Sequence, residues 1–235
     1  MADLTAIKRN LMETYKGCVV TQSYLRLERD LQGGATTQLK FDVLSTESVY
    51  GAPSPIENRL KVTDVFVATA ISMYIYKAGT SATASAVTLA QRAGSRLATS
   101  PNVGVFTTAG ESAALMNIYN GNLKLLVNRK VYFESLDCRR FYRVGDIQAG
   151  LIQATGGVTT QEDNWPEANY GMIGLDPTLT IGGASQNDFS VNMPAAVTAA
   201  GTASSNFIVL YFRGYQVQGA ADQFERAQRA VDFQG

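Results

Sequence analysis

The sequence predicts an all-β fold, a β-sandwich of the jelly-roll type with short N-terminal, middle and C-terminal helices. Residues 206–217 form an almost unbroken run of β-branched, aliphatic and aromatic residues, and residues 62–77 form a second such run. Most other apolar segments alternate with period two between turns of uneven length. Roughly eight to ten strands joined by uneven loops favour a jelly roll, with a closed barrel as the structural alternative. We expect residues 1–235 to form a single domain.

The run at 206–217 is predicted to be a central strand, because both of its faces are apolar. Phe207, Val209 and Val217 share one face with two tyrosines, and Ile208 and Leu210 lie on the other with Phe212. Residues 62–77 have the same character. The run at 206–217 is expected to lie next to them or next to the N-terminal hairpin. The pair Arg213-Gly214 interrupts the first run, which predicts a bulge or a close backbone contact at that point.

Residues 1–17 are predicted to form an N-terminal helix. Leu4, Ile7 and Leu11 recur at helical spacing, and Gly17 is placed to end the helix. Alternation with period two then begins at Val19 and resumes at 39–43 after Gly33-Gly34. Two alternating runs around a Gly-Gly turn predict a β-hairpin with one solvated face.

The middle of the chain mixes loops with short elements. Residues 45–61 contain glycine and prolines and are expected to be a surface loop, and residues 86–97 allow a weak helix. A short strand is predicted at 103–107 and a helix at 111–119. Leu123 begins a further strand, and residues 131–133 either continue it or pair back through a turn at Asn128-Arg129.

The last third is predicted to begin with a long loop at 145–174. Pro177 then introduces a strand at 178–181, and a further strand follows at 189–193. Phe224, Ala227 and Val231 recur at helical spacing, so that the C-terminal region 220–235 is predicted to be helical.

Composition argues against several classes of function. Lys plus Arg equals Asp plus Glu at 20 each, which disfavours strong nucleic-acid binding through surplus cations. The chain has no histidine, the usual general base and metal ligand. We therefore expect no catalysis, no cofactor and no metal. Charged residues make up only 17% of the chain, which fits a subunit partly covered by neighbours.

The two cysteines, Cys18 and Cys138, lie far apart in the sequence. Two buried free thiols are the favoured interpretation, and a disulfide is the alternative. The first ten residues are polar, without the apolar run of a signal peptide. The protein is therefore expected to be made in the cytoplasm of the producing cell and to be soluble.

Two basic groups are candidate contact surfaces. Lys8, Arg9 and Lys16 lie on the polar side of the N-terminal helix. They favour a solvated face, with contact to a genome or lipid surface as the alternative.

The second group combines arginines with aromatic residues, a mixture that is common at subunit contacts. Plain surface ranks second for this group, and binding of single-stranded nucleic acid ranks third. Its members are Arg139, Arg140, Tyr142 and Arg143.

A third candidate is a sugar site in the long loop. Glu162 and Asp163 stand beside Trp165, and paired acids near an aromatic ring are typical of carbohydrate binding. The alternative interpretation is that Trp165 anchors the loop and that the two adjacent carboxylates point apart.

Several short motifs together resemble the jelly-roll coat proteins of tailless icosahedral bacterial viruses. They span about the last two-thirds of the chain. The motifs are Pro101-Asn102 with Phe106, Ala114-Leu115 to Ile118-Tyr119-Asn120-Gly121, Leu125 to Asn128, Pro177 to Gly182, Phe189 to Pro194, and Leu210 to Gly214. Members of that family with two jelly rolls have more strands than this chain supplies.

The resemblance implies a non-catalytic virion subunit, made in the host cytoplasm, that assembles with copies of itself into trimers or hexamer-like capsomers. Other virion proteins would be further partners. Zero net charge adds that a shell of such subunits would not condense a genome alone, so that an internal membrane or a separate packaging system is expected. The alternative hypothesis is a carbohydrate-binding β-sandwich that uses Glu162, Asp163 and Trp165.

Overall fold

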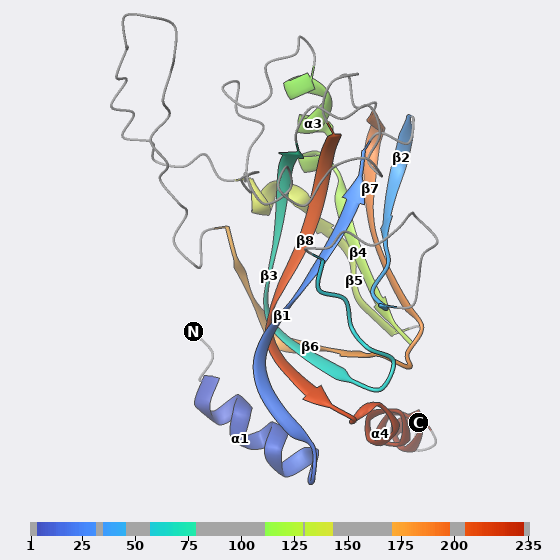
Figure 1. The fold of residues 1–235 in the computed structure, drawn as a ribbon. Helices are drawn as coiled ribbons and strands as arrows, with labels where there is room; N and C mark the ends of the chain where they lie inside the picture. The colour runs from blue at the N-terminus through green and yellow to red at the C-terminus, as the bar shows by residue number, and fades with distance from the viewer. Residues whose placement is uncertain are drawn as a thin grey trace, which may run out of the picture.

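The structure is a computed structural model that describes residues 4–31, 35–45, 57–78, 111–128, 130–142, 171–197 and 205–232. Within them, two four-stranded antiparallel sheets pack face to face (Figure 1). Sheet A has the order β1-β8-β3-β6, and sheet B has the order β2-β7-β4-β5. The strands are β1 (Val19–Asp30), β2 (Thr36–Phe41), β3 (Val65–Ala78), β4 (Asn122–Val127), β5 (Lys130–Asp137), β6 (Ile173–Gly182), β7 (Asn187–Val197) and β8 (Ser205–Gln218).

The pairing of the strands is that of a jelly roll. The first strand pairs with the last, and the pairs then proceed inward along the chain as β2 with β7, β3 with β6, and β4 with β5. This is the pattern of one long hairpin rolled up so that its pairs alternate between two sheets. The predicted all-β sandwich of jelly-roll type is therefore confirmed.

The helices of the described part are α1 (Leu4–Thr14), α3 (Glu111–Tyr119), α4 (Ala221–Asp232) and the 3-10 helix η2 (Cys138–Phe141). α1 and α4 lie at the end of the sandwich where β1 begins, and α3 lies at the opposite end (Figure 1). The three predicted helices are confirmed. Gly17 has φ of +84°, a conformation that glycine adopts readily, shortly after α1 ends.

β8 is central, as predicted, because it pairs with both β1 and β3. Ile208, Leu210 and Phe212 face the main core between the sheets, where the ring of Phe212 lies 5.6 Å from that of Phe189 in sheet B. Tyr215 and Val217 face outward into a second core beneath α1 and α4, which we call the outer core. Its buried members are Leu11, Tyr15, Val65, Val67, Tyr215, Val217, Ala220 and Phe224. Both faces of this strand are therefore covered, which explains its continuous apolar sequence.

β3 contains a bulge at Thr69, opposite Arg213 and Gly214 of β8. Ala68 pairs with Gly214 and Ala70 with Arg213, so that Thr69 is an extra residue, and its hydroxyl donates to the carbonyl of Arg213 at 3.1 Å. The bulge shifts the alternation by one residue, so that Val67 faces the outer core before it and Ile71 faces the main core after it. The predicted bulge or close contact at Arg213-Gly214 is confirmed.

The predicted hairpin between residues 19–28 and 39–43 is wrong. Those segments form β1 and β2, which lie in different sheets and pair with β8 and β7. Alternation identifies a half-buried strand correctly, but it carries no information about its partner. Here the partner strands lie near the other end of the chain.

Two strand boundaries were also wrong, and both involve a proline. β6 begins at Ile173, inside the segment predicted as a loop, and passes through Pro177. β7 continues through Pro194 to Val197. Both prolines fall where the register jumps, between Gly174 and Leu179 in β6 and between Asn192 and Val197 in β7. A residue without a backbone N–H is tolerated there, because the ladder does not need its hydrogen bond.

Other expectations have mixed outcomes. β4 and β5 form a hairpin through Asn128, which has φ of +48°, so that of the two alternatives for residues 131–133 the structure has the one that pairs back through a turn. Residues 57–60 are not a surface loop, since Leu60 is fully buried. The weak helix at 86–97, the strand at 103–107 and most of the loop at 145–174 lie outside the described residues.

We predict that Gly214→Ala destabilises the fold. An added Cβ would overlap the carbonyl oxygen of Val67 in the neighbouring strand, and this backbone cannot retreat without disturbing the pairing of β3 with β8. The expected loss is about 1–3 kcal/mol of unfolding free energy, measured by urea denaturation. Gly174→Ala is the matched control, because its Cβ would meet no atom within 4 Å. Equal stability of the two variants would contradict the prediction.

Candidate functional site

The most concentrated group of buried charges lies where the two sheets meet beside β1. Residues 57–60 run along this margin and form backbone hydrogen bonds on both of their sides. The backbone N–H of Arg26 donates to the carbonyl of Asn58 at 2.9 Å, and that of Asn58 donates back at 3.1 Å. On the other side, the N–H of Leu60 donates to the carbonyl of Val43 at 2.9 Å. The segment therefore ties β1 of sheet A to the chain that follows β2 of sheet B.

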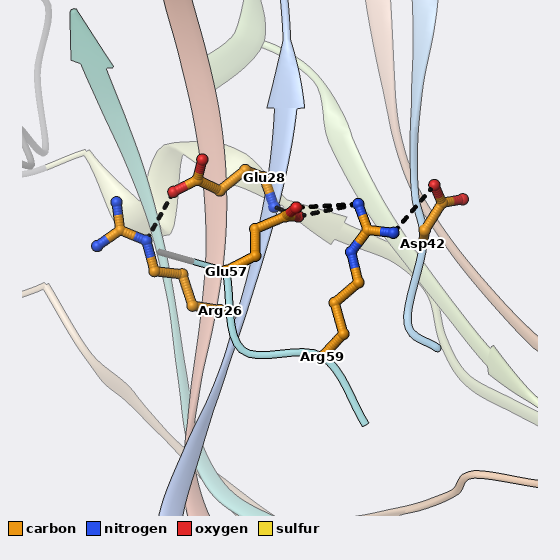
Figure 2. A network of polar contacts seen from close by, with 5 residues as sticks. All are labelled: Arg26, Glu28, Asp42, Glu57 and Arg59. Carbon is orange, nitrogen blue, oxygen red and sulfur yellow. Dashed lines mark hydrogen bonds and ion pairs between the residues drawn. The ribbon is translucent and has the colours of Figure 1, made fainter. Parts of the chain in front are cut away.

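The side chains at this margin form a charged staple, defined as Arg26, Glu28, Asp42, Glu57 and Arg59 (Figure 2). Nε of Arg26 lies 2.7 Å from Oε1 of Glu28. Oε1 of Glu57 accepts the backbone N–H of Glu28 at 2.7 Å. Nη2 of Arg59 lies 3.0 Å from Oε2 of Glu57, and its Nη1 lies 3.5 Å from Oδ2 of Asp42.

The staple is buried. The side chains of Glu28, Asp42, Glu57 and Arg59 are 2%, 5%, 3% and 6% exposed. Buried charges require partners, and each charge drawn in Figure 2 is directed at another member of the staple. We therefore interpret it as a structural link between the sheets. The staple was not predicted from the sequence, although Glu57 and Arg59 alternate with Asn58 and Leu60 as strand residues would.

Lys8, Arg9 and Lys16 are all exposed, as expected. The first two lie on α1, and Lys16 lies in the turn that joins α1 to β1. Leu11 and Tyr15 occupy the opposite side and pack into the outer core. The three cations therefore form a surface group at the end of the sandwich where β1 begins.

The second basic group lies elsewhere. Arg139 and Arg140 are exposed on η2, which contacts α3 near the far end of the sandwich from α1 (Figure 1). The guanidinium of Arg139 donates to Oδ1 of Asn120 at 2.9 and 3.1 Å, which fixes its position. The ring of Tyr142 packs edge-on against Tyr119 at 5.4 Å. The structure does not bring this group together with Lys8, Arg9 and Lys16.

Four candidate residues cannot be placed. Arg143 and the proposed sugar-site residues Glu162, Asp163 and Trp165 lie outside the described residues. Both hypotheses about these residues therefore stay predictions.

The outer face of sheet A carries a tyrosine cluster that sequence analysis missed. The rings of Tyr24 and Tyr211 stack at 5.3 Å with an interplanar angle of 7°, and Tyr74 meets Tyr211 edge-on at 6.3 Å. Burial raises the pKa of Tyr211, and the neighbouring tyrosines add to this effect. The three residues come from β1, β3 and β8, so that only the strand pairing reveals the cluster.

Both cysteines are free thiols. Cys138 is fully buried, and this burial, together with the nearby charge of Asp137, raises the pKa of its thiol to about 12. Cys18 is half-buried in the turn that precedes β1. Burial also raises the pKa of Tyr119, which packs in the main core close to Cys138.

The described residues contain no group of three or more side chains suited to a metal ion. A shallow hollow beside Gly214 is lined by Leu4, Gln22, Thr69 and Arg213, but it encloses essentially no volume. No helix in this part of the chain combines the length and apolar character needed to cross a membrane.

No protein-family model, curated protein or solved structure matches the chain. Function is therefore inferred from the fold and from the chemistry of its surfaces.

We predict that Arg59→Met lowers the unfolding free energy by about 3–5 kcal/mol, because it leaves the carboxylates of Glu57 and Asp42 buried without this cation. Arg140→Met removes the same charge from an exposed site and should change stability by less than about 0.5 kcal/mol. Urea denaturation of both variants measures the difference. A loss for Arg59→Met no larger than that for Arg140→Met would show that the staple does not hold the sheets together.

Thiol alkylation near pH 8 should distinguish the cysteines. Cys138 is buried and largely protonated at that pH, whereas Cys18 is partly accessible. We expect iodoacetamide to label Cys18 in the folded protein, and Cys138 only after denaturation, as read by mass spectrometry of peptides. Rapid labelling of native Cys138 would contradict the placement of η2.

Proposed function

We propose that the chain is a coat subunit of a virion, a structural protein that assembles with copies of itself into a shell. The observation that carries the proposal is the jelly-roll pairing of β1 with β8 through to β4 with β5, an architecture used by viral capsid proteins and also by lectin domains and cupins. A topology shared by several classes does not by itself choose among them.

The surface chemistry favours a role in assembly over a role in catalysis. The acidic residues of the staple, Glu28, Asp42 and Glu57, are buried and paired within the protein, so they are not placed to meet a substrate. Large exposed apolar side chains gather on the first two elements, with Leu4 and Met12 on α1 and Val19 and Tyr24 on β1. Exposed apolar groups beside polar ones are typical of protein contact surfaces.

The partners that fit this proposal are further copies of the chain, arranged as trimers or hexamer-like capsomers in a virion, together with other virion proteins. The net charge of zero disfavours genome condensation by the shell itself. An internal membrane or a separate packaging system is therefore part of the proposal. Lys8 and Arg9 on α1, with Lys16 in the turn that follows, form a basic surface that an anionic membrane would attract.

Electron microscopy of the purified full-length protein, over a range of concentration and salt, tests the proposal. We predict closed shells or regular capsomers with a defined number of subunits. A protein that stays monomeric under all of these conditions would overturn it. If that monomer also bound glycans and lost the binding in Trp165→Ala, the carbohydrate-binding alternative would replace the coat function.

A further inference from the structure

The four edge strands of the sandwich, β1 and β6 in sheet A and β2 and β5 in sheet B, differ in how they are protected. An unprotected edge presents backbone groups that can pair with another chain. β5 has two register shifts and charged residues at both ends. β6 has Pro177 inside its register jump, and β2 is short, with a register shift and Lys40.

The first half of β1 has none of these devices. Its residues Val19–Tyr24 carry no charge and no proline, and their register with β8 is continuous. The second half is different, because it contains four charged residues and is covered by residues 57–60 at Arg26. We call residues 19–24 the open edge, which ends at Tyr24, where the backbone carbonyl accepts the side-chain amide of Asn58. In Figure 1 it lies at the margin of sheet A between α1 and α4.

The direction of the backbone groups on the open edge follows from the covered half. The N–H groups of Arg26 and Glu28 point away from β8, since they donate to Asn58 and Glu57. The alternation of an antiparallel ladder then directs the N–H groups of Val20, Gln22 and Tyr24 outward as well. Among the described residues, no backbone group pairs with the outward N–H of Val20 or Gln22.

The side chains of the open edge are also those of a contact surface. Val19 is 57% exposed and Tyr24 is 42% exposed, although β-branched and aromatic residues usually gain from cross-strand neighbours. One ring face of Tyr24 packs on Tyr211, so that its position is already fixed before any partner arrives. A strand placed beside β1 would cover both side chains.

We propose that the open edge pairs with the same segment of a second copy, antiparallel about a two-fold axis at Thr21, which sets Val20 of one copy opposite Gln22 of the other and so joins sheet A of one subunit to sheet A of the next. Identical segments are self-complementary in this arrangement, since each residue and its opposite exchange places across the axis. The absence of charge in residues 19–24 means that two copies meet without like-charge repulsion. This deepens the proposed coat function and rests on it for the identity of the partner.

The test uses charge at the exposed Gln22. Gln22→Lys places two like charges diagonally across the axis from each other, and Gln22→Glu does the same with the opposite sign. Each variant alone should weaken self-association about tenfold or more, whereas an equimolar mixture should associate as the wild type does. Sedimentation equilibrium of the full chain measures both effects. Thr37→Lys, on the exposed surface of β2, is the matched control and should leave association unchanged.

Hydrogen exchange gives a second readout. The peptide containing residues 19–24 should become protected when wild-type subunits associate, because the outward N–H groups acquire partners. The Lys variant should show native protection in β8 and no added protection in residues 19–24, which separates lost pairing from lost folding.

Each outcome decides between the two proposals. Wild-type shells with Gln22→Lys shells formed equally well would overturn the open-edge inference and leave the coat function standing. Dimers that respond to Gln22 substitution, without capsomers or shells under any condition, would support the inference and overturn the coat function. A wild-type protein that stays monomeric at all concentrations would overturn both.

Discussion

The pairing of β8 between β1 and β3 is the interaction on which the rest of the structure depends. It joins the last strand to the first and to the centre of sheet A, so that neither strand has its full set of backbone partners until the chain is nearly complete. Contacts of such long sequence separation are costly to form, because a long loop must be closed first. In return, β8 contributes to both the main core and the outer core.

β3 and β8 contribute to both cores, because each strand is covered on both of its faces. The bulge at Thr69 and the missing side chain at Gly214 let the two backbones approach closely where the alternation shifts. Before the bulge, Val65 and Val67 pack beneath α1 and α4, while Phe66 and Ala68 between and after them face the main core. Asp64 holds the same region from inside, since its carboxylate accepts the N–H of Gly219 at 3.1 Å and the side-chain amide of Gln216 at 2.7 Å. The end of β8 and the start of α4 are thereby fixed to the beginning of β3.

The two halves of the β1 margin differ in how far other segments cover them, and this difference connects the fold to the proposed function. The charged staple covers the second half of β1 with buried ion pairs. Residues 57–60 add backbone hydrogen bonds to β1 on one side and to the chain after β2 on the other. In the first half of the same strand, the outward N–H groups of Val20 and Gln22 have no backbone partner among the described residues. In the proposed coat subunit, the protected edges would limit random aggregation, and the open edge would be the place where copies pair.

The sequence predicts the central strands well, because runs that are apolar on both faces, such as residues 206–217, can only be satisfied in a covered strand. The three helices follow from their spacing and from the residues that end them. Partner choice is different: the alternation of β1 and β2 says nothing about β8 and β7, which is why the hairpin was wrong. The staple and the tyrosine cluster escape prediction for the same reason, since their members come from segments far apart in the sequence.

Native-state hydrogen exchange of the amides of β8 tests the central claim most directly. If β8 joins the first strand to the centre of the sheet, the amides of Val209 to Phe212 should exchange only through global unfolding, with a free energy equal to that from urea denaturation. They should rank among the slowest in the chain. Exchange of these amides through local opening, at a free energy well below the global value, would contradict the account.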